Sequence, residues 1–306
     1  MMNPYHMLMN RIHNGERILI DGATGTEVER RGVPQLDNAW NGGGALTHPD
    51  IVRQIHEDYI GSGAQIVISN TFATARHVLR DAQWEEHFEF LNRRGVELAQ
   101  EARHNMQAPD VLVAGGISHW SWVEHPSHDE LRANIEEQAE IMAAAGADLI
   151  MLEMMINIEK TLILLEAAQK TGLPVWVGFS CEVDEEGVAR LWEGATLEEA
   201  IEAIQDKKVP LVSIMHTEVE YVDACLDVLQ ANPSTSSGTN WSGAIGVYAH
   251  SGLYVGSEWI FDDVISPDEY ASAAERWLAR GVQVIGGCCG IGVEHIEMLK
   301  NETLGA

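Results

Sequence analysis

The chain has 306 residues, which fits one large α/β barrel or two smaller domains and is long enough to bury a substantial core. Its formal net charge of −28 argues against nucleic acids and anionic membranes as partners, because both are bound through basic patches. No segment resembles a signal peptide or a membrane span, and the four cysteines do not form a secreted disulfide pattern. These features predict a soluble, cytoplasmic protein.

Eight short apolar runs predict strands along the chain. Each is followed by a loop that contains glycine or polar residues, as expected where buried strands end. The predicted strands cover residues 17–20, 65–68, 111–114, 148–152, 175–179, 210–214, 244–248 and 282–285.

Amphipathic stretches with helical spacing fill the gaps between these strands. The predicted helices cover residues 49–62, 73–106 (one long or two shorter helices), 130–145, 157–171, 197–205, 219–231, 267–279 and 293–299. Residues 232–242 are polar and predict a surface loop. Apolar strands alternating with helices favour a parallel sheet, and eight such units favour a single-domain (β/α)8 TIM barrel over residues 1–306. A doubly wound fold would need a glycine fingerprint after the first strand, which Gly22-Ala-Thr-Gly does not supply.

Residues that can bind metals or polar ligands recur where the predicted strands end. In such a barrel these carboxyl ends share one face, and active sites lie there. Glycines flank Cys288 and Cys289, so the backbone can leave extended geometry and let both thiols reach one target. This soft pair suggests zinc, although two buried structural cysteines or a vicinal disulfide are alternatives. The residues at the strand ends are Asp21, Asn70, His119, Glu153, Cys181, His216, His250, Cys288 and Cys289.

Three sets of motifs resemble the signatures of the homocysteine S-methyltransferases. They are Asp21-Gly-Ala-Thr-Gly-Thr-Glu27 with Arg30-Arg-Gly32, Ser69-Asn-Thr-Phe72, and Gly286-Gly-Cys-Cys-Gly290 with Glu294-His-Ile296. The resemblance runs from the first predicted strand to the last. It implies a (β/α)8 barrel with one zinc ion at its mouth, which binds the homocysteine sulfur and activates it as a thiolate that accepts a methyl group.

The resemblance also implies which residues bind the substrate. Asp21 and Glu153 correspond to carboxylates that hold the homocysteine amino group, and an α-ammonium group does need acidic acceptors at hydrogen-bond distance. Asn70 is expected to shape the floor of the pocket. No catalytic side chain is expected beyond the metal-activated thiol. The expected substrate-binding residues are Asp21, Gly22, Asn70 and Glu153.

Two of the family's three zinc-binding cysteines correspond to Cys288 and Cys289, but the third is replaced. Where the family has cysteine after the sixth strand, this chain has His216. Neutral imidazole is a competent zinc ligand, so the sequence favours a zinc site made of His216, Cys288 and Cys289. Two alternatives stay open: Cys181 supplies the third thiolate, or the site has lost zinc or binds another metal.

The resemblance predicts transfer of a methyl group from a small onium donor, of betaine or sulfonium type, to homocysteine to give methionine. Such donors carry a positive centre, which aromatic faces attract. The chain has no room for separate folate and cobalamin modules, which favours a small diffusible donor. The aromatic residues in or near the predicted mouth loops are Trp40, Trp120, Trp122, Trp192, Tyr248, Tyr254 and Trp259.

Two other functions fit the sequence. One is a metal-dependent barrel enzyme of different chemistry, with His119, His216 and His250 around a metal-bound water. The other is a non-catalytic protein that binds thiols or metals. The expected partners are a small thiol and a small onium donor, with no nucleic acid and no membrane, and a homo-oligomer is compatible with the sequence.

Overall fold

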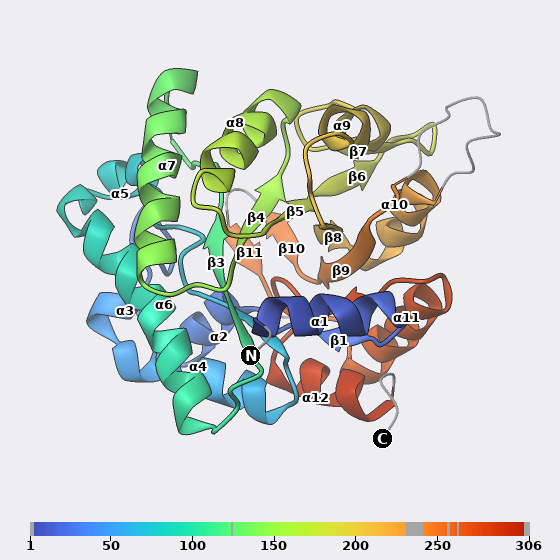
Figure 1. Cartoon of the computed structure of the whole chain (residues 1–306), viewed down its shortest axis with the longest axis horizontal. Helices are drawn as coiled ribbons and strands as arrows, with labels where there is room; N and C mark the ends of the chain where they lie inside the picture. The colour runs from blue at the N-terminus through green and yellow to red at the C-terminus, as the bar shows by residue number, and fades with distance from the viewer. Residues whose placement is uncertain (1–2, 124, 231–240, 256–257, 262, 303–306) are drawn as a thin grey trace.

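The barrel closes through eight parallel strands. The computed structural model describes residues 3–123, 125–230, 241–255, 258–261 and 263–302. The strands form one sheet in the order β1-β12-β9-β8-β5-β4-β3-β2. A parallel bridge between Ile20 and Ile66 joins its two edges, so the sheet becomes a barrel. The predicted (β/α)8 fold is therefore confirmed (Figure 1).

All eight barrel strands overlap the apolar runs that predicted them. Two antiparallel hairpins were not predicted, one made of β6 (Cys181–Val183) and β7 (Ala189–Leu191), the other of β10 (Leu253–Val255) and β11 (Glu258–Ile260). The barrel strands are β1 (Ile18–Leu19), β2 (Ile66–Ile68), β3 (Leu112–Ile117), β4 (Leu149–Met155), β5 (Val175–Phe179), β8 (Leu211–Glu218), β9 (Ala244–His250) and β12 (Val284–Ile285).

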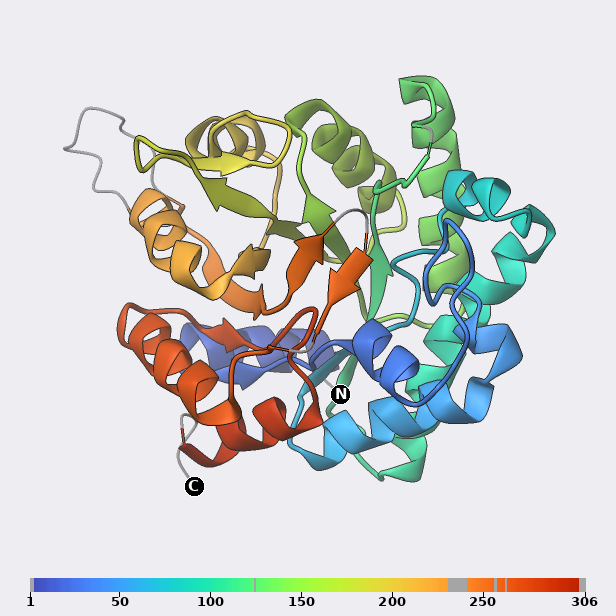
Figure 2. The ribbon, with the colours of Figure 1, turned by 180° about the vertical axis from the view of Figure 1, so that it is seen from behind.

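Helices surround the barrel, as the view from behind also shows (Figure 2). The predicted stretch 73–106 divides into α5 (Arg76–Asp81), η1 (Glu85–His87) and α6 (Phe88–Asn105). Three helices fall outside the predicted ranges: α1 (Pro4–His13), α2 (Thr24–Arg30) and α3 (Gly44–Thr47). The others are α4 (Pro49–Gly61), α7 (His128–Ala144), α8 (Ile158–Gln169), α9 (Leu197–Ile204), η2 (Val219–Tyr221), α10 (Val222–Leu229), α11 (Pro267–Ala279) and α12 (Val293–Glu302).

Helix α1 covers the end of the barrel at which the strands begin (Figure 1). Its buried face belongs to the apolar cluster that fills the barrel interior, and the Trp176 Nε1–H of β5 donates a hydrogen bond to the Tyr5 hydroxyl at 3.0 Å. A polar site is therefore expected at the opposite end of the barrel, where the strands finish.

Two further sequence predictions concern membrane spans and the polar loop predicted at residues 232–242. Among the described residues, no helix is both long and apolar enough to cross a membrane. Most of the predicted surface loop, residues 232–240, lies outside the described residues.

Candidate metal and substrate site

The cysteine pair lies in a tight loop directly after β12. The Cys288 amide donates to the carbonyl of Ala249 at 2.8 Å, and the carbonyl of Cys289 accepts from the Ser251 amide at 2.9 Å. Gly290 has φ +81°, and a Cβ there would lie 2.0 Å from the Ser251 carbonyl oxygen. Only glycine can both adopt this backbone conformation and allow that approach. The loop is thus held against the end of β9 with its thiols beside the barrel mouth.

His216 reaches the same place because β8 contains a bulge. Along the β8–β9 ladder, Met215 pairs with Tyr248 and Glu218 pairs with His250, so three steps on β8 oppose two on β9. His216 sits in this irregular stretch with φ +43°, in the left-handed region. A bulge breaks the alternation of faces along a strand and re-aims a side chain, as often occurs beside active sites.

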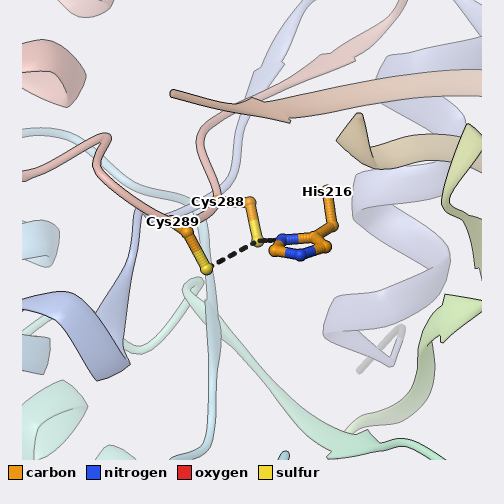
Figure 3. A group of neighbouring side chains, drawn as sticks. All are labelled: His216, Cys288 and Cys289. Carbon is orange, nitrogen blue, oxygen red and sulfur yellow. Dashed lines mark hydrogen bonds between the residues drawn. The ribbon is translucent and has the colours of Figure 1, made fainter. Parts of the chain in front are cut away.

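The three residues converge (Figure 3). Their ligand atoms all lie within 4.8 Å of one another, and this is the group of metal-binding type found among the described residues. Cys288 Sγ lies 3.4 Å from His216 Nδ1 and 3.9 Å from Cys289 Sγ. A tetrahedral zinc with Zn–S of about 2.3 Å and Zn–N of about 2.0 Å would separate two sulfurs by about 3.8 Å, and a sulfur from a nitrogen by about 3.5 Å. The donor types and the two spacings made by Cys288 therefore fit zinc.

Cys181 lies apart from this group. Its side chain belongs to the apolar core around the barrel, where it contacts Cys225 of α10. Its amide instead donates to Thr217 Oγ1 at 3.0 Å, which ties the β6 hairpin to the bulge of β8. The geometry therefore does not favour Cys181 as the third metal ligand.

The two thiols of the pair have opposite shifts in pKa. The Cys288 S–H donates a hydrogen bond to Cys289 Sγ, which raises the pKa of Cys288 and lowers that of Cys289. The nearby His216 ring also favours a thiolate at Cys289. A thiolate is the form that binds metal, so the lowered pKa of Cys289 favours cation binding at this sulfur.

A cavity of about 720 Å³ opens beside these residues. Its charged lining residues other than histidine are all acidic: Glu29, Asp37 and Glu153. The described residues that line it include no lysine or arginine. The cavity therefore attracts cations.

Glu153 lines the cavity from a second bulge, at the end of β4. Leu152 pairs with Val177 and Met155 with Phe179, so again three steps oppose two, and Met154 has φ +57°. The carboxyl group lies over β3, where a Cβ on Gly116 would come within 2.6 Å of Glu153 Oε2. Burial, together with the negative charge of Cys289, raises the pKa of Glu153 to about 8. A positive ligand would favour its ionised form.

Asp21 lies next to the cavity but is not part of its lining. Its Oδ2 accepts a hydrogen bond from the Ile68 amide at 2.8 Å, across the junction of β1 and β2. Burial raises the pKa of Asp21 well above its usual value, and Glu153 adds to that rise. The two predicted substrate carboxylates are therefore close enough to interact electrostatically.

Gly22 and Asn70, the other two predicted substrate residues, both line the cavity. A Cβ at Gly22 would lie 2.5 Å from the carbonyl oxygen of Ile291, so glycine is needed for the chain to pass there. Asn70 is buried, and its Nδ2 donates to the carbonyl of Asn41 at 3.3 Å. Both residues are placed where they could contact a substrate.

The other two histidines at the strand ends differ in position. His250 contacts His216, with ring centroids 4.6 Å apart. His119 is buried and is not in the metal-binding group found among the described residues. Burial lowers the pKa of each ring to about 3, so both are neutral. The structure does not gather His119, His216 and His250 around one point.

Aromatic side chains form one wall of the cavity. Trp120 makes edge contacts with Trp122 and Trp192, at centroid distances of 6.1 and 6.3 Å, and Trp192 lies 5.2 Å from the His216 ring. Tyr254 and Trp259, also predicted near the mouth, belong to the β10–β11 hairpin, whose side chains lie outside the described residues. The predicted aromatic residues that line the cavity are Trp40, Trp120, Trp122, Trp192 and Tyr248.

The sequence profile of the family described as homocysteine S-methyltransferase matches residues 18–303. The chain belongs to the homocysteine S-methyltransferase family. It is 26% identical to homocysteine S-methyltransferase of Escherichia coli, with 97% of this chain and 98% of that protein covered. It is also 26% identical to selenocysteine Se-methyltransferase of Brassica oleracea var. italica, over 90% of this chain and 86% of that one.

Solved structures agree with this assignment. The crystal structure of the homocysteine methyltransferase MmuM from Escherichia coli, in its metallated form, matches with a TM-score of 0.77 at 25% identity. The match covers 97% of this chain and 99% of that one. The protein is therefore an S-methyltransferase, and its match to MmuM extends over nearly the full length of both chains.

Some lining residues were missed by reasoning from the sequence. Met154 and Met215 face the cavity, and the Met154 amide contacts Met215 Sδ at 3.0 Å. Neither residue type signals a site, and only their position at a bulge places them there. The rim residues Glu29 and Asp37 were also missed, although the turn-forming residues Asp37 and Asn38 before Gly42 are typical of a loop.

Proposed function

We propose that the protein is a zinc-dependent S-methyltransferase that transfers a methyl group from a small onium donor to homocysteine, giving methionine. The convergence of His216, Cys288 and Cys289 beside a large cavity carries this proposal. Two thiols and an imidazole suit zinc, and a site with three protein ligands leaves the fourth position for a substrate. When bound, zinc supplies the Lewis acidity that lowers the pKa of an incoming thiol.

Homocysteine is supported as the acceptor by the carboxylates near the metal-binding group. Its α-ammonium group would meet Glu153 in the cavity wall, with Asp21 behind it. An ammonium ion held there favours the ionised Glu153, which can then form a charge-assisted hydrogen bond. Gly22 and Asn70 would lie along the same side of the bound amino acid.

An onium donor is supported by the aromatic and acidic side chains that line the cavity. The tryptophan faces of Trp40, Trp120, Trp122 and Trp192 attract a positive centre by about 0.5 to 2 kcal/mol each when they lie over it. Glu29 and Asp37 at the rim add negative charge. A donor with a quaternary nitrogen or a sulfonium sulfur matches both features, whereas the acidic residues at the rim would repel an anionic donor.

The proposal is tested by metal analysis combined with methyl-transfer assays on the full chain. We expect about one zinc per chain, methionine formation from homocysteine with at least one betaine or sulfonium donor, and loss of both on chelation. Selenocysteine tests whether a selenol is accepted as well. Zinc without methyl transfer from any onium donor would instead favour a metal enzyme of different chemistry, and tight thiol binding without metal would favour a non-catalytic protein.

A further inference from the structure

The His216 ring packs against two other rings at the cavity wall. It lies 5.2 Å from the Trp192 ring and 4.6 Å from the His250 ring, measured between centroids, with interplanar angles of 49° and 42°. All three side chains come from different segments: Trp192 follows β7, His216 lies in the bulge of β8, and His250 ends β9. The imidazole is therefore packed between one ring from a barrel strand and one ring that directly follows the β6–β7 hairpin.

The backbone at His216 also has unusual support. A φ of +43° is uncommon for a residue with a side chain and persists only where the surroundings hold it. Thr217 is fully buried, and its Oγ1 both donates to the Met215 carbonyl at 2.9 Å and accepts from the Cys181 amide. The His250 ring makes a hydrogen bond to the backbone of His216. His250 thus contacts both the ring and the backbone of the same residue.

This double contact bears on which ring nitrogen faces the thiols. The atom nearest Cys288 Sγ is Nδ1, at 3.4 Å. Nδ1 lies close to the backbone within the side chain, so its position depends strongly on the φ and ψ angles and on the first side-chain torsion. Any relaxation of the bulge, or rotation of the ring, would turn Nδ1 away from the sulfurs.

We infer that His250 is a positioning residue, which holds the bulge and the imidazole of His216 so that Nδ1 faces Cys288 and Cys289. The inference rests on the proposed metal site and adds a second histidine to it in a supporting role. Groups that orient a metal-binding histidine typically contribute about ten- to a hundredfold to metal affinity. His250 supplies that orientation through ring packing and a backbone hydrogen bond.

The test is a double-mutant cycle in the full-length protein, with zinc and Co²⁺ affinities measured by competition with a chromophoric chelator. His250→Leu is expected to weaken metal binding about ten- to a hundredfold and to change the visible spectrum of the Co²⁺ form. In a His216→Ala background, where only the two cysteines remain, the same substitution should change affinity less than threefold. A merely structural role for His250 would lower affinity by the same factor in both backgrounds.

A matched control is His56→Leu, which replaces another fully buried histidine, on α4, and should leave metal affinity and the Co²⁺ spectrum unchanged. If His250→Leu does not fold, His250→Gln is used, since it keeps a hydrogen-bond donor but removes the ring and should fall between the wild type and the His216→Ala variant. Unchanged affinity and spectrum in the His250 variant, or equal factors in both backgrounds, would overturn the inference. If the wild type binds neither metal, or His216→Ala binds as tightly as the wild type, the proposed metal site itself fails.

Discussion

Gly290 offers the sharpest test of how the cysteine loop is built. A Cβ at this position would lie 2.0 Å from the Ser251 carbonyl oxygen, while real Cβ atoms stay beyond 3.0 Å, so Gly290→Ala must separate the two segments by at least about 1 Å. Alanine in the left-handed region costs about 1–2 kcal/mol. The separation would also break the bonds from the Ser251 amide to Cys289 and from the Gly290 amide to Thr26, each of about 1 kcal/mol. We expect a total loss of about 3–4 kcal/mol in the free energy of unfolding.

Urea unfolding of the metal-free protein measures this loss, and a zinc competition assay measures the accompanying displacement of Cys289. Gly32→Ala is the matched control, because Gly32 has φ +80° but a methyl group at its Cα would meet nothing within 4 Å. That variant should lose only about 1–2 kcal/mol and keep the zinc affinity of the wild type. If Gly290→Ala unfolds like the control and binds zinc equally well, the close approach to Ser251 does not constrain the loop.

Three further predictions concern other residues. Cys288→Ala should abolish stoichiometric zinc in metal analysis, whereas Cys181→Ala should retain it; the reverse would restore Cys181 as a ligand. Glu153→Gln should raise the KM for homocysteine about 10- to 100-fold with a normal melting temperature, and an unchanged KM would remove Glu153 from substrate binding. Burial lowers the pKa of His56 to about 4, below its unfolded value of about 6.5, so the unfolded chain binds the proton first and stability falls as the pH drops through this window. From pH 7 to pH 5 the wild type should lose about 2 kcal/mol more than His56→Leu in urea unfolding, and parallel pH profiles would contradict this.

The barrel could be predicted from the sequence because its strands are buried on both faces. A buried parallel strand must be apolar along its length, so runs such as 175–179 are visible without a structure. Helix α1 was missed although its buried face is as apolar as that of many predicted helices. It covers the barrel floor rather than following a strand, so the alternating pattern gives no reason to expect it.

From the sequence, the site residues could be placed only at the ends of predicted strands. Cys288, Cys289 and His216 do converge, but the choice between His216 and Cys181 needed the structure, since both follow predicted strands. What decides it is the bulge of β8, which places His216 beside the cavity, whereas the Cys181 side chain lies in the outer core against Cys225. A bulge depends on pairing with a neighbouring strand, and a single strand's residues do not encode it.

Asp21 helps to close the barrel and also lies next to the cavity. Where β1 meets β2 there is one bridge, and the Ile68 amide is satisfied by the Asp21 carboxylate instead of a backbone carbonyl. The joint between the first and second strands is therefore partly made by a side chain that also sits within electrostatic reach of Glu153. Under the proposed function, a substitution at position 21 would alter folding and substrate binding together, so a change that improves one would be constrained by the other. A barrel of this construction can diversify its substrates more freely at the rim than at its first strand.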